Sequence, residues 1–205
     1  MSVTETLTVP AVGPDSAGIL MTPEEFDAIT EYDPIYDYEL VHGVLVVNPI
    51  PSEMEAEPNE LLGGLLFDYQ EHHPQGSALD LTLQDRYIRL PNSRRKADRV
   101  IWAGLGRRPH PRDDVPTIIV EFVSPGKANW RRDYIEKRHE FLALGVREYW
   151  VIDRFRRTLT VYRDLPGAEG ETVILEPQSY APPLLPGFDL PLARLLAAAD
   201  AWQEP

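Results

Sequence analysis

The spacing of hydrophobic residues along the chain changes between helical and extended patterns. Hydrophobic residues recur at the spacing of one helix face over 61–69, which predicts a helix. Leu79, Leu81 and Leu83 alternate with polar residues, as in a half-buried strand. The run 116–123 is almost wholly apolar and predicts a central strand covered on both faces. Further strands are expected at 87–90, 98–103, 148–152, 158–162 and 171–175.

Capping and turn residues mark the ends of other elements. Thr22 offers a helix N-cap hydroxyl and Glu25 completes a capping box, so a helix is predicted over 22–30. The turn at His42-Gly43 predicts a hairpin over 38–47. The same reasoning places a loop at 48–58 and helices at 130–144 and 190–202.

The order of these elements predicts an α/β or α+β fold, a sheet with helices packed on it. The length of 205 residues suits one domain, which we expect at 21–200, between a flexible arm at 1–20 and a short tail at 201–205. No apolar stretch is long enough for a transmembrane helix, and the chain has no cysteine. These features exclude disulfides and thiolate chemistry, and we expect a cytoplasmic protein without a membrane partner.

Charge is distributed unevenly along the chain. Residues 1–85 contain 17 acidic residues and no Lys or Arg, residues 86–163 carry a net charge of +10, and residues 164–205 carry −6. Either the three segments interleave in the fold and cancel, or 86–163 forms a basic face for a polyanion. The overall charge of −13 argues against tight, indiscriminate nucleic-acid binding.

Three carboxylates occupy strands or strand ends. Glu121 is the one charged residue in the apolar run, where an unpaired carboxylate would cost several kcal/mol. It is therefore paired with an arginine, placed near water, or a ligand of a hard cation. Asp98 opens a strand, and its alternative to metal binding is a salt bridge at the strand edge. Glu39 precedes the hairpin turn, and its alternative is an exposed position on the hairpin.

Lys137 is the fourth candidate. It follows Tyr134 by three residues and precedes Phe141 by four, so it shares an inward helix stripe with two aromatic residues. It is a candidate base or charge stabiliser, or else a snorkelling lysine or a surface partner of Asp133. Trp130 is expected in the core or an interface, with stacking on an unpaired base as the alternative.

Together the carboxylates and the lysine predict a site for Mg²⁺ or Mn²⁺ with phosphodiester chemistry. Carboxylate oxygens are ligands that Mg²⁺ prefers, and a bound metal ion activates water and stabilises charge on a phosphate. Lys137 would orient or deprotonate that water.

Several segments, taken in order, resemble a known family. They are Tyr38-Glu39-Leu40-Val41-His42-Gly43, Ala97-Asp98, Ile119-Val120-Glu121-Phe122-Val123-Ser124-Pro125, Lys137, the run from Gly145 to Asp153, and the run from Leu185 to Leu190. The resemblance is to the Uma-type putative restriction endonucleases, a group within the PD-(D/E)XK nuclease superfamily, and covers about 21–198.

The resemblance implies a restriction-endonuclease-like mixed sheet flanked by helices and a Mg²⁺-dependent DNA endonuclease. By position it makes Asp98, Glu121 and Glu39 the metal ligands and adds Lys137 as the fourth catalytic residue. Ala97 replaces the motif's proline and Val123 occupies the usual lysine position, so activity depends on Lys137 reaching the site. A homodimer is expected because one site cuts one strand; a catalytically inactive module that binds nucleic acid or protein is the alternative.

Overall fold

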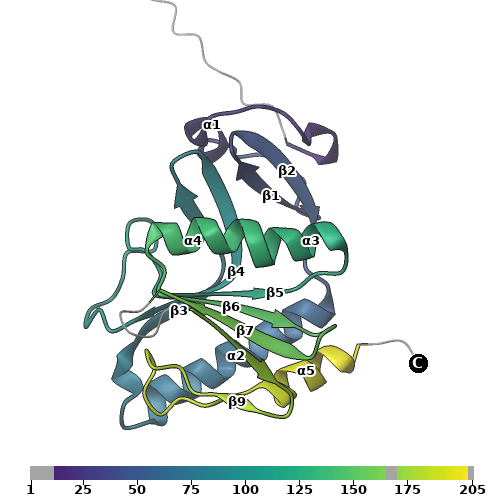
Figure 1. Ribbon diagram of the computed structural model, residues 1–205. Helices are drawn as coiled ribbons and strands as arrows, with labels where there is room; N and C mark the ends of the chain where they lie inside the picture. The colour runs from purple at the N-terminus through teal and green to yellow at the C-terminus, as the bar shows by residue number, and fades with distance from the viewer. Residues whose placement is uncertain (1–11, 165–169, 203–205) are drawn as a thin grey trace, which may run out of the picture. The chain divides into compact units, whose positions relative to one another are not determined.

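The structure, a computed structural model, describes residues 12–164 and 170–202 (Figure 1). Two compact units are recognised: Met1–Ile50 with Tyr87–Lys96, and Pro51–Arg86 with Ala97–Pro205. The strands are β1 (Tyr36–Val41), β2 (Val44–Pro49), β3 (Leu79–Leu90), β4 (Ser93–Ala103), β5 (Ile118–Phe122), β6 (Glu148–Asp153), β7 (Thr158–Arg163), β8 (Gly170–Leu175), β9 (Ser179–Tyr180) and β10 (Leu190–Pro191). The helices are α1 (Pro23–Asp27), α2 (Glu53–His72), α3 (Lys127–Arg131), α4 (Arg138–Leu144) and α5 (Leu192–Asp200), with short 3₁₀ turns at Pro14–Ser16 and Gly76–Ala78 and a π turn at Arg132–Lys137.

The first unit is built around the predicted hairpin. β1 and β2 pair antiparallel, and the turn residues His42 and Gly43 both have positive φ, as a tight hairpin turn requires. The hydroxyl of Thr22 accepts from the amide of Glu25, so the predicted capping box starts α1, which ends at Asp27.

The predicted arm at 1–20 falls only partly within the described residues. Residues 1–11 lie outside the described residues, so a flexible arm over 1–11 stays a prediction. Within 12–20, Val12 forms a bridge to Tyr32 and Leu20 forms a bridge to Val44. Val12 is also buried, in one cluster with Tyr38, Leu40 and other side chains of the first unit.

The second unit contains most of a mixed sheet in the order β4-β5-β6-β7-β8, with β3 paired to β4; the end of β3 and the start of β4, within Tyr87–Lys96, belong to the first unit. β5 and β6 are parallel, whereas β4–β5, β6–β7 and β7–β8 are antiparallel. Helices cover both faces: the run α3–α4 lies on one side of β5–β7, and α2 and α5 lie on the other (Figure 1). The predicted α/β class, a mixed sheet flanked by helices, is confirmed.

Alternation along β5 divides its side chains between these two helical layers. Ile118, Val120 and Phe122 belong to the core cluster that includes residues of α2 and α5. Glu121 therefore projects to the opposite face of the sheet, toward α3–α4. The central strand predicted over 116–123 is confirmed, because every residue of β5 is buried.

Several boundaries differ from those predicted; α1 ends at Asp27 rather than at residue 30, and α5 spans Leu192–Asp200 rather than 190–202. Residues 53–58 are not loop but the start of α2, because the side chain of Glu55 accepts from the amide of Ser52 and closes a capping box. β4 begins at Ser93 rather than at residue 98, and the helix expected over 130–144 begins at Lys127. Ser52 and Glu55 have the spacing of a capping box, but the many prolines of this segment favoured a loop in the prediction.

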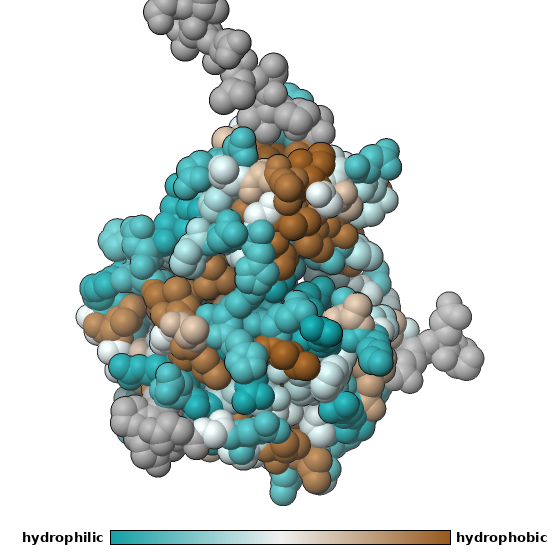
Figure 2. Space-filling model, turned by 45° about the horizontal axis from the view of Figure 1, so that its top comes forward, coloured by the Kyte–Doolittle hydropathy of each residue, from teal (hydrophilic) through white to brown (hydrophobic). Residues whose placement is uncertain are grey.

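The face drawn in Figure 2 is mostly hydrophilic, with hydrophobic patches between the polar side chains. No helix in the described ranges combines the length and the apolar character needed to cross a bilayer.

Candidate functional site

The pairing of β4 with β5 brings Asp98 beside Glu121. Arg99 is opposite Val120 and Val100 is opposite Ile119, so one further antiparallel step sets Asp98 opposite Glu121. Directly opposite residues project from the same face of the sheet. The backbone amide of Phe122 also donates to Oδ2 of Asp98 at 2.6 Å. Two acids separated by 22 residues in the chain are thus cross-strand neighbours.

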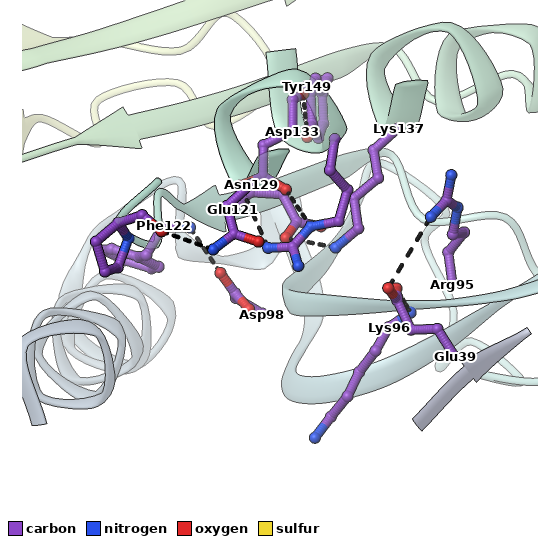
Figure 3. Close-up of polar contacts among 12 residues, drawn as sticks. Glu39, Arg95, Lys96, Asp98, Glu121, Phe122, Asn129, Asp133, Lys137 and Tyr149 are labelled. Carbon is purple, nitrogen blue, oxygen red and sulfur yellow. Dashed lines mark hydrogen bonds and ion pairs between the residues drawn. The ribbon is translucent and has the colours of Figure 1, made fainter. Parts of the chain in front are cut away.

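Glu121 is almost completely buried, with an exposed fraction of 1%. Nζ of Lys137 donates to its Oε2 at 2.8 Å (Figure 3). Its other oxygen, Oε1, is buried and accepts no hydrogen bond from the described residues. Burial raises the pKa of Glu121 well above its usual range; Lys137 opposes this rise, and the nearby charges of Asp98 and Asp133 add to it.

Asp98 is half-buried and has a perturbed carboxyl group. Burial raises its pKa to about 6, against the lowering influence of Lys137 and of the hydrogen bond from the amide of Phe122. A neighbouring Asp133 charge raises it further. Clustered carboxyl groups with raised pKa values are common at functional sites.

The helical run that covers this face supplies Lys137. The predicted inward stripe is observed, since Tyr134, Lys137 and Phe141 are all buried. The side chain belongs to a π turn, Arg132–Lys137, inserted between α3 and α4. Such turns are rare and frequently occur at functional sites. Lys137 is therefore a partner of Glu121 across the helix–sheet interface, rather than a snorkelling surface residue.

The chain was compared with known proteins. It matches the Uma2 family, described as "Putative restriction endonuclease", over residues 23–193. The chain belongs to this family. No curated protein matches it. A solved structure, a putative nuclease belonging to DUF820 from Anabaena variabilis ATCC 29413, aligns with a TM-score of 0.66 at 16% identity, covering 87% of this chain and 99% of that one; at this identity the likeness shows the shared fold.

Membership of the Uma2 family confirms the resemblance drawn from the sequence. It does not assign roles to individual residues. Asp98, Glu121 and Lys137 come together in the second unit, and Lys137 reaches Glu121 although Val123 occupies the usual lysine position. Their catalytic and metal-binding roles remain predictions.

Glu39 belongs to the first unit of this Uma2 protein. It is not the exposed hairpin residue that the sequence allowed, because its exposed fraction is 2%. Its Oε1 accepts from the backbone amide of Lys96 at 2.7 Å, and its Oε2 lies 4.0 Å from Nη1 of Arg95. Its proposed place among the metal ligands stays a prediction.

Asp133 was not selected from the sequence as a site residue. It is completely buried, its Oδ1 accepts from Nε of Arg132 at 2.9 Å, and its carbonyl accepts from the hydroxyl of Tyr149 at 2.9 Å (Figure 3). The signal was available, since Asp133 precedes the inward-facing Lys137 by four residues and so lies on the same helix face.

Asn59 was missed because it lies between the loop predicted at 48–58 and the helix predicted over 61–69. Its Nδ2 donates to the carbonyl of Asp98 at 2.9 Å, and its Oδ1 accepts from Nε of Arg99 at 2.7 Å. Helix α2 thereby fixes the backbone at Asp98 from the opposite side of the sheet.

The donor set of the second unit suits a hard cation. Asp98 and Glu121 supply carboxylate oxygens, and the buried Oε1 of Glu121 is an acceptor that lacks a donor among the described residues. Hard oxygen ligands are those preferred by Mg²⁺, which usually retains several waters and needs few protein ligands. No cluster of three or more His, Cys, Asp or Glu side chains arranged to hold a metal is found within 12–164 and 170–202. The pair is thus the candidate centre.

Proposed function

We propose that this Uma2 protein is a metal-dependent endonuclease that hydrolyses phosphodiester bonds of DNA. Membership of a family of putative restriction endonucleases supports a nuclease. One observation carries the finer proposal: Glu121 is buried beside Asp98 and Lys137, with one of its oxygens lacking a donor in the described part of the chain. Burying such a carboxylate is costly unless a cation compensates it.

Asp98 and Glu121 would hold Mg²⁺ or Mn²⁺ through their carboxylate oxygens. When bound, the ion lowers the pKa of a water molecule and neutralises charge on the phosphate. Asp98, whose pKa is about 6, is ionised above that pH and is then ready to bind a cation. The hydrogen bond from the amide of Phe122 holds Oδ2 of Asp98 in position.

Lys137 is proposed to stabilise charge beside the scissile phosphate. Its Nζ is a donor fixed against Glu121 by the 2.8 Å contact, so an attacking water molecule or a phosphate oxygen would meet a positioned ammonium group. The ammonium also compensates part of the negative charge that Asp98 and Glu121 concentrate between them. Burial of the lysine keeps this interaction from being weakened by solvent.

Replacing either acid tests this function. We expect Asp98→Asn and Glu121→Gln to reduce Mn²⁺-dependent nicking of supercoiled plasmid by more than 100-fold, because each change removes a negatively charged ligand. Asp113→Asn is the matched control, since it removes one negative charge from an exposed residue. Circular dichroism checks the fold. Undiminished nicking by both site variants would disprove the proposal.

A non-catalytic module with a nuclease fold is the alternative, and one observation favours it. The contact between Lys137 and Glu121 engages Oε2, and an ion pair can serve stability alone. Calorimetric titration with Mn²⁺, combined with plasmid, single-stranded DNA and RNA cleavage assays, separates the two. Binding of Mn²⁺ without cleavage of any of these substrates would favour the module.

A further inference from the structure

A cavity in the same unit shares no lining residue with the Asp98–Glu121–Lys137 cluster. Its volume is about 300 Å³. The helical run, the turn after β6 and strand β7 supply the wall residues that matter here: Trp130, Tyr134, Arg138, Arg156, Thr158 and Thr160. This volume lies at the lower end of the range typical of small-molecule sites, roughly 300–1,000 Å³.

Aromatic rings and guanidinium groups are layered in this wall. Trp130 stacks on Tyr134 with ring centroids 5.1 Å apart and planes inclined by 25°. The guanidinium carbon of Arg156 lies 5.2 Å from the Trp130 ring centroid and 5.4 Å from that of Tyr134. Arg138 lies 4.0 Å above the ring of Tyr162. Flat cationic and aromatic surfaces of this kind stack on unpaired bases in nucleic-acid-binding proteins.

Two donors in the wall have no acceptor among the described residues. They are Nε1 of Trp130 and Nε of Arg138, and both atoms are buried. Buried donors without an acceptor are rare in native proteins, and a bound ligand is one source of the missing partner. Two residues that line a cavity large enough for a small ligand thus each have one buried donor atom without an acceptor among the described residues.

Of the described residues that line the cavity, three are charged: Arg138, Arg156 and Glu171. Asp153 lies behind the wall, where its Oδ2 accepts from the hydroxyl of Tyr134 at 3.0 Å and lies 3.7 Å from Nε of Arg156. The side chain of Arg156 nevertheless has 57% of its surface exposed, so it retains surface for a further contact.

We propose that this cavity binds one unpaired nucleotide of a single-stranded DNA segment. The base would stack on the Trp130–Arg156 wall, and the two phosphates that flank the nucleotide would lie against Arg138 and Arg156, one on each. Duplex DNA offers no free base face, so the cavity would distinguish frayed or single-stranded ends from paired DNA. The inference is independent of catalysis, because binding needs neither metal nor cleavage.

Binding of a labelled oligonucleotide tests the proposal. Fluorescence anisotropy of a fluorescein-labelled thymidine hexamer is measured with the full chain in EDTA. We expect Trp130→Ala and Arg156→Ala to weaken binding about tenfold each, because each change removes a surface on which the base stacks. Arg131→Ala is the matched control, because Arg131 is the neighbour of Trp130 in the chain, has 71% of its side chain exposed and does not line the cavity.

An abasic hexamer with the same phosphates separates base stacking from charge attraction. We expect it to bind about tenfold more weakly than the thymidine hexamer, and inorganic phosphate to compete poorly. Equal affinity for the two hexamers, or equal loss in Arg131→Ala, would overturn the proposal. Trp130→Phe retains a ring and guards against misfolding of the alanine variant; it should bind more tightly than Trp130→Ala.

Failure of this proposal and failure of the nuclease proposal are distinguishable. Asp98→Asn should retain hexamer binding while losing cleavage, because Asp98 does not line the cavity. A protein that cuts DNA but binds both hexamers equally would refute the nucleotide site alone. A protein that binds the thymidine hexamer selectively but never cuts would refute the nuclease alone.

Discussion

The ionised carboxylate of Asp98 is expected to lower the free energy of unfolding at neutral pH. Its folded-state pKa of about 6 exceeds the usual value of 3.8, so the folded state holds the proton more tightly. The free energy of unfolding therefore falls as pH rises from about 4 to about 6, and the penalty persists above that range. We expect Asp98→Asn to raise the free energy of unfolding at pH 8 by at most about 3 kcal/mol, as measured by urea titration in EDTA.

The effect of Asp98→Asn should be small near pH 4 and disappear near about pH 2, where the carboxyl group is protonated in both the folded and the unfolded state. Asp27 provides the opposite case: burial raises its pKa, but hydrogen bonds and charges from Arg94 and Arg89 lower it on balance. Asp27→Asn should therefore destabilise the protein at neutral pH, by an amount that shrinks as the solution is acidified. Stabilisation by Asp98→Asn that is equal at pH 4 and pH 8 would contradict the assigned pKa.

At the scale of elements, two adjacent glycines of α2 differ in what surrounds them. A Cβ at Gly63 would lie 2.7 Å from Nη2 of Arg99, whereas nothing lies within 4 Å of one at Gly64. The guanidinium cannot easily move, because Nη2 and Nε of Arg99 donate to Asn59 at 2.8 and 2.7 Å. Gly63 thus permits the close approach of α2 to β4 beside Asp98.

Alanine substitutions should separate these two glycines. We expect Gly64→Ala to stabilise the protein by about 0.5–1 kcal/mol through helix propensity. Gly63→Ala should instead destabilise it by roughly 1–3 kcal/mol, because overpacking outweighs that gain. Urea unfolding of both variants measures the difference, and stabilisation by both would show that Arg99 moves aside freely.

Local signals predicted the elements better than their boundaries or their pairing. Three features were predicted from the sequence because each has a local physical cause: the capping box at Thr22, the hairpin turn at His42 and the apolar strand β5. The π turn was not predictable, because periodicity over 130–144 reports an inward face and not an inserted residue. Likewise, sequence identified Asp98 and Glu121 as unusual acids, but only the register of β4 on β5 makes them neighbours.

At the scale of the whole molecule, the segments of opposite charge interleave. Arg94 pairs with Asp27 and Lys96 pairs with Asp37, joining the basic segment to the acidic N-terminal segment. Arg157 pairs with both Glu176 and Asp200 of the acidic C-terminal segment. These contacts favour cancellation of charge over a continuous basic face.

Salt dependence tests this view of the charge. If only Arg138 and Arg156 neutralise phosphates of a single strand, the logarithm of the hexamer association constant should fall against log salt with a slope of about −1.4. Arg156→Ala should reduce the magnitude of the slope by about 0.7, because one fewer counterion is released. Affinities measured between about 50 and 400 mM KCl give both values. A slope steeper than about −3 would mean that many more cations contact the strand. Such a steep slope would support a broad basic face over residues 86–163. A slope of about −1.4 would instead indicate that DNA contacts only the arginines of the cavity.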